Sequence, residues 1–170
     1  MAATYTLISS NVLGSSAASV TFSAIPSTYT DLVVRFSGRS DTSSTIVSIT
    51  FNGDTATNYS NVRLRGDGTS AYSFLDSSVN KIYGYYGTNT SSTTSNTFTN
   101  AEMYIPNYLV SANKPVSYYS VQEDNATAAN ILPSANLWRN TAAITSITFT
   151  PNTGNLVSGS SFYLYGIKNS

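Results

Sequence analysis

VSITF, residues 47–51, sets the fold class of this chain. Val47, Ile49 and Phe51 alternate with Ser48 and Thr50, so the three apolar side chains lie on one face of an extended strand. β-branched and aromatic residues also favour strands over helices. The same alternation recurs in VTF at 20–22, ITF at 147–149 and FYL at 162–164. These segments predict half-buried strands that face a common core.

Short strands and turns follow one another around this segment, from one end of the chain to the other. The sequence NGD at 52–54 suits a hairpin turn with positive φ. No segment predicts a convincing helix, although 124–130 and 134–139 each have room for one helical turn. The pattern predicts an all-β antiparallel sandwich or barrel, folded as a single domain over residues 1–170. The expected strands are 5–9, 19–23, 31–37, 45–52, 61–65, 80–86, 97–105, 116–122, 144–150 and 161–167.

The chain contains no histidine and no cysteine. Histidine is the only side chain whose unperturbed pKa lies near neutral pH, so its absence removes Ser-His-Asp and Cys-His chemistry. Zinc and copper also lose their preferred nitrogen and sulfur ligands. We therefore expect a protein that is not an enzyme and that uses no cofactor and no metal.

Two weaker alternatives rest on the acidic residues. A glycosidase needs only two carboxylates, and Glu102 lies in a strand-like stretch from which it could line a groove, with Glu123 as the second glutamate. Loop oxygens of Asp67, or of Asp124 with Asn125, could hold calcium, but the ordered spacing of a dedicated calcium loop is missing. Local hydrogen bonding in turns explains these aspartates better.

Charges are few and balanced, with eight basic and eight acidic residues. Nucleic-acid binding needs clustered Lys and Arg, and only the pairs Arg35/Arg39 and Arg63/Arg65 approach a patch. A solvated sheet face explains both pairs better. The N-terminal segment does not resemble a secretory signal, and no apolar run reaches the about 20 residues of a membrane span. We expect neither nucleic acid nor membrane as a partner, and synthesis in the cytoplasm.

Thirteen tyrosines are the most suggestive side chains for binding. Tyrosine offers a large contact area with a hydroxyl group, which suits protein interfaces and sugar-binding platforms. Tyr83 and Tyr85 are spaced to share a strand face, whereas one of the neighbours Tyr118 and Tyr119 must point inward. We take these four as candidate partner-binding residues, with plain sheet packing as the alternative. The lone Trp138 is expected to anchor the core.

Two segments are expected outside the packed sheets. Residues 88–97, TNTSSTTSNT, read as a long exposed Ser/Thr-rich loop. Residues 1–10 are short, uncharged and able to add a strand to a neighbour's sheet edge. They are therefore a candidate N-terminal arm that orders on assembly.

Three longer phrases resemble a group of small all-β virion proteins of tailed bacteriophages. They are TYTLISSNVLGSSAASVTFSAIPSTYTDLVVR at 4–35, FNGDTATNYSNVRL at 51–64 and LWRNTAAITSITFTPNTGNLVSGSSFYLYGIK at 137–168. The phrase IPxxYTDL and the closing strand that ends in YGI carry most of the likeness. The resemblance implies a jelly-roll-like sandwich, assembly on the virion and a homo-trimer. Related modules occur as capsid decoration (cement) proteins and as parts of tail fibres, and the resemblance supplies no catalytic motif.

These observations favour a structural virion protein that decorates and reinforces a bacteriophage capsid by bridging capsid subunits. Its partner would be the major capsid protein, and its location the capsid surface. The alternative is a tail-fibre or receptor-binding module that contacts host surface carbohydrate. We favour the head protein because a fibre subunit usually carries an attachment domain or a repetitive shaft, and these 170 residues read as neither.

Overall fold

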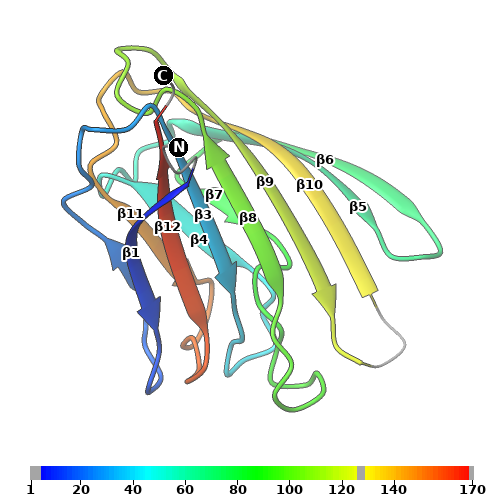
Figure 1. Ribbon diagram of the computed structural model, residues 1–170. Helices are drawn as coiled ribbons and strands as arrows, with labels where there is room; N and C mark the ends of the chain where they lie inside the picture. Colours follow the sequence, from blue (N-terminus) through cyan, green and yellow to red (C-terminus); the bar gives the residue numbers. More distant parts are fainter. Residues whose placement is uncertain (1–4, 126–128, 169–170) are drawn as a thin grey trace.

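The computed structural model describes residues 5–125 and 129–168. These residues form strands in two antiparallel sheets, and none of them lies in a helix (Figure 1). The prediction of an all-β sandwich is confirmed. The strands are β1 (Thr6–Val12), β2 (Val20–Phe22), β3 (Asp31–Ser37), β4 (Val47–Phe51), β5 (Tyr59–Gly66), β6 (Ala71–Val79), β7 (Ile82–Gly84), β8 (Asn100–Ile105), β9 (Lys114–Glu123), β10 (Ala129–Trp138), β11 (Ile147–Pro151) and β12 (Ser161–Ile167).

Eight of these strands pair in the nested order of a jelly roll. β1 pairs with β12, β2 with β11, β3 with β8 and β4 with β7, all antiparallel. This is the pairing that results when one long hairpin is rolled up. The roll gives two four-stranded sheets, with the orders β1-β12-β3-β8 and β2-β11-β4-β7. We call these eight strands the jelly-roll body.

Two further hairpins widen one of the sheets to eight strands. The β5–β6 hairpin is inserted between β4 and β7, and the β9–β10 hairpin between β8 and β11. β9 pairs with β8, and the added strands continue in the order β9-β10-β5-β6. We call these four strands the extension. In Figure 1 the extension fans out to the right, and the smaller sheet lies behind the body.

Aromatic side chains from both sheets fill the core of the body. Phe36 stacks on Phe162 with ring centroids 5.2 Å apart, and Phe149 from the smaller sheet lies 5.4 Å from both rings. Burying a ring of this size contributes about 1.5–3 kcal/mol to folding. Trp138 is fully buried against Phe51 at the boundary with the extension, so the prediction that it anchors the core is confirmed.

The NGD turn has the predicted backbone but a different role. Asn52 and Gly53 both have positive φ, 53° and 68°, and the N–H of Asp54 donates to the carbonyl of Phe51 at 2.9 Å. These are the features of a primed turn. The turn does not close a hairpin, however, because β4 lies in the smaller sheet and β5 in the larger one. It sends the chain from one sheet to the other.

Sequence patterns locate most strands but miss β6 and β10. The predicted strands 31–37 and 161–167 coincide with β3 and β12. The segment 134–139, expected to have room for a helical turn, lies in β10 as far as Trp138. Of the other such segment, 124–130, residues 126–128 lie outside the described residues and Ala129 begins β10.

The predicted N-terminal arm over 1–10 is wrong for its second half. Residues 6–10 belong to β1, which pairs with β12 along the edge of the larger sheet. The backbone groups that a free arm would offer to a neighbour are partly used within the chain. Residues 1–4 lie outside the described residues.

Residues 88–97 form the predicted loop, but its start is buried rather than exposed. Thr88, Asn89 and Thr90 are each less than 5% exposed. The guanidinium of Arg39 enters the loop. It donates to the carbonyl of Thr94 at 2.9 Å and to that of Thr97 at 3.1 Å. Arg39 therefore organises this loop instead of lying on an open sheet face.

Candidate functional site

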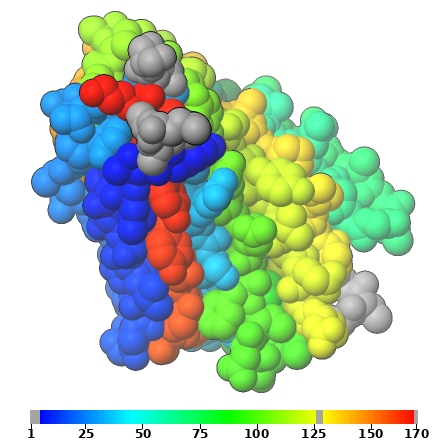
Figure 2. Space-filling view, viewed as in Figure 1, coloured from blue at the N-terminus to red at the C-terminus, as the bar shows by residue number. Residues whose placement is uncertain are grey.

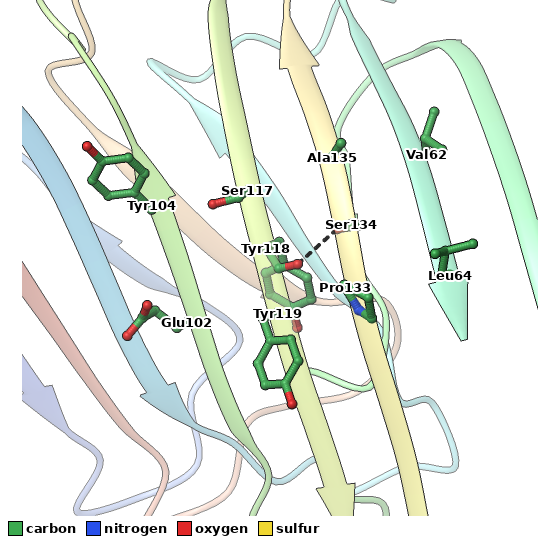
Figure 3. A pocket seen from close by; sticks show the side chains of 10 residues that line it. All are labelled: Val62, Leu64, Glu102, Tyr104, Ser117, Tyr118, Tyr119, Pro133, Ser134 and Ala135. Atoms are coloured by element: carbon green, nitrogen blue, oxygen red, sulfur yellow. Dashed lines mark hydrogen bonds between the residues drawn. The ribbon is translucent and has the colours of Figure 1, made fainter. Parts of the chain in front are cut away.

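The outer face of the extension carries an apolar depression of about 440 Å³. Residues of four adjacent strands, β8, β9, β10 and β5, form it, and most of their side chains point outward (Figure 3). Figure 2 shows the outer face of the larger sheet, where β8, β9 and β10 succeed one another toward the hairpin β5–β6. The residues that line the depression are Val62, Leu64, Glu102, Tyr104, Ser117, Tyr118, Tyr119, Pro133, Ser134 and Ala135.

Strand register explains why the surface is hollow at this place. Ser117 lies opposite both Tyr104 and Ala135, and Ala135 lies opposite Val62. Two small side chains therefore stand between two larger ones in a single cross-strand row. Facing side chains in neighbouring strands are close enough to touch, so the short members of the row leave the space open.

Pro133 adds a second cause. Its register partner on β9 is Tyr119, but the pairing of β10 with β5 is interrupted between Ile131 and Ser134. Proline has no N–H to donate, so a central strand loses a ladder hydrogen bond at such a position. The outward ring of Pro133 and the side chain of Leu64 border the depression there.

The polar groups at the β8 side of the depression are already engaged. The Nε of Arg35 donates to Glu102 at 2.7 Å, and this contact raises the pKa of Arg35. The hydroxyl of Tyr104 donates to Asp31 at 2.8 Å, which raises the pKa of Tyr104. Glu102 is the one carboxylate among the lining residues. The predicted groove position of Glu102 is confirmed, and no second acid for a glycosidase pair lies among the described residues that line the depression.

On β5 the usual polarity of a surface strand is reversed. Val62 and Leu64 point outward and are 47% and 56% exposed, whereas Arg63 points inward and is 7% exposed. The Arg63 guanidinium lies over two rings, 4.1 Å from the centroid of Tyr85 and 4.8 Å from that of Phe74. Each ring offers it cation–π attraction. The prediction of a solvated face is therefore wrong for Arg63.

Polar partners complete the inner side of the hairpin. Arg63 forms an ion pair with Asp76, and Arg65 donates to Asn130 at 3.1 Å and to Asp67 at 3.2 Å. A smaller cavity of about 180 Å³ lies among these arginines and the neighbouring rings. Because each arginine has a carboxylate partner, the cavity offers no excess of positive charge.

The structure separates the four tyrosines proposed as partner-binding residues. Tyr83 and Tyr85 lie together, with ring centroids 5.9 Å apart, but Tyr85 packs on Arg63 at the inner side of the extension. Tyr118 is 1% exposed, and burial raises the pKa of its hydroxyl. It belongs to the core, so the prediction that it binds a partner is wrong. Tyr119 is 43% exposed on the outer face and borders the depression.

Sequence reasoning missed the aliphatic half of this surface. The predicted partner-binding residues do not include Val62, Leu64, Pro133 or Ala135. Apolar residues in a strand are ordinarily assigned to the core. The alternation of Val62 and Leu64 with the arginines was a visible signal of two different faces. Only the three-dimensional structure tells which of the two faces is buried.

Metal-binding groups and membrane-spanning helices were both sought in the described part of the chain. Among residues 5–125 and 129–168, no group of three or more Asp or Glu side chains could hold a metal ion. Within the same residues, no helix is long and apolar enough to cross a membrane. The lining of the depression on the outer face is largely apolar.

Comparison with known proteins assigns no family to the chain. No family model matches it, and neither the curated proteins nor the solved structures contain a match.

Proposed function

We propose that the protein is a structural virion protein that decorates a bacteriophage capsid and reinforces it by bridging capsid subunits. The observation that carries this proposal is the outward apolar surface of the extension, formed by residues such as Val62, Leu64, Pro133 and Tyr119. The resemblance to small virion proteins supplies the phage context. The partner would be the major capsid protein, the location the capsid surface and the oligomer a trimer.

The mechanism would rest on burial of apolar area rather than on charge. Each Å² of apolar surface removed from water contributes about 25 cal/mol. The charged groups beside the depression are paired within the chain, as Glu102 is with Arg35. They therefore exert little long-range attraction or repulsion on a partner. Modest contacts repeated by capsid symmetry would then sum to a substantial barrier against disassembly.

Co-sedimentation with phage heads stripped of this protein tests the proposal. We expect saturable binding of the wild-type protein at a stoichiometry that matches capsid symmetry. The double variant Val62→Ser/Leu64→Ser should lose this binding. Leu7→Ser is the matched control, because it changes an exposed apolar residue at the opposite edge of the same sheet. Equal binding of the wild-type and double-variant proteins would contradict the assignment of this surface.

Reinforcement has its own measurement. Decorated heads should resist heat and low salt better than stripped heads, and adding the purified protein back should restore the resistance. Equal resistance of stripped and decorated particles would refute the reinforcing role even if binding occurred.

One observation favours a second candidate, a tail-fibre or receptor-binding module for host surface carbohydrate. Tyr104 and Tyr119 flank the hollow at Ser117, and the ion pair of Arg35 with Glu102 stands at its side. Aromatic rings stack on the C–H faces of sugars while polar groups bind their hydroxyls. A glycan array would show hits that Tyr119→Ala removes if this role is correct, and no signal above background would count against it.

A further inference from the structure

The edges of the two sheets differ in how they are protected against pairing with another chain. Exposed edge strands offer unpaired N–H and C=O groups, and proteins usually blunt them by shortness, bulges, charges or proline. β2 and β7, the edges of the smaller sheet, have three residues each. β1, one edge of the larger sheet, has a register shift between Leu7 and Ser9. The remaining edge is β6.

β6 lacks these devices over most of its length. It has nine residues without proline or lysine, and its only charged residue is Asp76. The register with β5 runs without a shift from Ala71↔Gly66 to Asp76↔Asn61, and the irregularity lies beyond it, toward Tyr59. Among residues 5–125 and 129–168, no strand pairs with the outer side of β6, so residues 71–75 are a regular strand edge left open by the described part of the chain.

Both faces of this edge carry exposed apolar side chains. Leu75 is 69% exposed, Tyr72 42% and Phe74 39%. The rings of Tyr72 and Phe74 lie 6.2 Å apart in a stacked arrangement. A strand added beside β6 would cover side chains on both faces as well as pair its backbone.

We propose that β6 pairs antiparallel with β6 of a second copy across a two-fold axis at Ser73, which joins two eight-stranded sheets into one. In this register Tyr72 meets Phe74 of the second copy, and Ala71 meets its Leu75. Every large residue of the segment thus faces an apolar partner, and only the two Ser73 residues face each other. Cross-strand aromatic pairs are among those that stabilise sheets.

Charge favours a second copy as the occupant. Residues 71–75 carry no charge, so two copies meet without like-charge repulsion at the pairing edge. Asp76 follows directly, but it is ion-paired with Arg63 of its own chain and lies opposite Ser70 of the second copy in this register. Pairing with β1 of another copy would place the bulge at Leu7–Ser9 against the regular edge.

The contact is small, so its strength must depend on concentration. A few strand rungs bury less than the about 1,200–2,000 Å² of a standard stable interface. We therefore expect a reversible dimer in solution that becomes dominant where copies are held close together. The inference does not rest on the proposed function, because it concerns only two copies of this chain, and a two-fold contact at β6 can join copies that belong to different trimers.

Cysteine crosslinking reads this two-fold contact directly. The chain has no cysteine, and Ser73 is exposed, so Ser73→Cys adds a single thiol without disturbing the fold. Facing residues of an antiparallel pair have Cα atoms about 4.5–5.5 Å apart, which is within reach of a disulfide. Under mild oxidation, Ser73→Cys should form a covalent dimer about tenfold more than Ser77→Cys, an exposed control on the same strand.

A second crosslinking experiment tests the proposed register between the two β6 strands. Ala71→Cys mixed with Leu75→Cys should give a mixed disulfide dimer, whereas Ser10→Cys on β1 mixed with Leu75→Cys should not. Crosslinking of Ser73→Cys no greater than that of Ser77→Cys would overturn the proposal. Preferred crosslinking of Leu75→Cys to Ser10→Cys would replace it with β6–β1 pairing.

Sedimentation velocity of uncrosslinked protein tests the equilibrium. Ser73→Lys places two positive charges against each other at the two-fold axis and should abolish concentration-dependent association, while Ser77→Lys should retain it. Circular dichroism would confirm that both variants keep the sheet. Identical association of the two lysine variants would refute the β6 contact. Because none of these measurements uses phage heads, their failure is distinguishable from failure of capsid binding.

Discussion

The body and the extension share one eight-stranded sheet, yet they distribute apolar residues in opposite ways. In the body, inward positions are aliphatic or aromatic, as with Phe36 and Phe162. In the extension, several inward positions are polar, and aliphatic side chains such as Leu64 face outward. The buried polar residues of the extension are Asn61, Arg63, Lys114, Ser120, Gln122, Asn130, Ser134 and Asn136. The difference follows from what covers each part.

Side chains of the smaller sheet cover the body, whereas backbone covers much of the extension. The hydroxyl of Ser120 donates to the carbonyl of Tyr85 at 2.8 Å, and the side chain of Asn61 accepts from the N–H of Tyr83 at 3.2 Å. A buried backbone group without a partner costs about 1–3 kcal/mol. Polar side chains on the inner face of the extension therefore complement backbone groups of β7 and of Tyr85, which directly follows it.

The largest expected effect lies in the body. Phe149→Ala should lower the free energy of unfolding by about 3–5 kcal/mol, because it removes a fully buried ring and leaves a cavity. Phe74→Ala in the extension should cost less than about 1 kcal/mol, since that ring is partly exposed. Urea unfolding followed by the fluorescence of the single Trp138 measures both. Equal losses would erase the energetic distinction between the two parts.

An intermediate effect is expected at the inner side of the extension. Arg63→Met keeps the bulk but leaves Asp76 without its ion-pair partner and loses the cation–π contacts. We expect a loss of about 1–3 kcal/mol. Amide hydrogen exchange should quicken in β5 and β6 while the body stays protected. Arg35→Met, which breaks an exposed ion pair with Glu102, is the control and should change stability by less than about 1 kcal/mol. Faster exchange throughout the body would show that the two parts unfold as one unit.

The same contrast explains what could be predicted from the sequence. Body strands such as β3 and β12 were located because a buried face demands the apolar alternation that sequence patterns detect. β10 alternates too, but Asn130, Ser134 and Asn136 occupy its inward positions. The sequence does not predict β6, because this strand is exposed on both faces and therefore needs no alternation of apolar and polar residues. Of the exposed residues of the candidate site, the sequence predicts Tyr119 and Glu102 but not the aliphatic ones, because the outward direction of the aliphatic residues depends on the tertiary cover.

A smaller, pH-dependent effect is expected at the junction of the two parts. Partial burial raises the pKa of Asp54, but hydrogen bonds from Asn58, Trp138, the N–H of Ala56 and Asn140 outweigh it and hold the pKa below its usual value. A lowered carboxyl pKa stabilises the fold above the unfolded value of about 3.9, and this stabilisation is lost as pH falls through the folded value. Asp54→Asn should therefore be less stable than the wild-type protein by about 1 kcal/mol or less at pH 6.

The measurement is urea unfolding of both proteins between pH 2 and 7. The difference between them should begin to shrink near pH 4, where Asp54 of the unfolded chain becomes protonated, and should vanish as pH falls through the lowered pKa of folded Asp54. A difference that stayed constant with pH would mean that the carboxylate charge does not strengthen the hydrogen bond from the Trp138 indole, which measures 2.8 Å. The junction would then be held by packing alone.

The smallest stability effect is expected where the proposed binding effect is largest. Leu64→Ser removes an aliphatic side chain that is 56% exposed, so the free energy of unfolding should change by less than about 0.5 kcal/mol. Ile49, a core residue of the body, is 0% exposed. Ile49→Ser should therefore lower the free energy of unfolding several-fold more than Leu64→Ser does. Thermal unfolding compares the two variants directly. If Leu64→Ser destabilised the isolated protein as strongly as Ile49→Ser, the outward aliphatic residues would be part of the core rather than a surface kept for a partner.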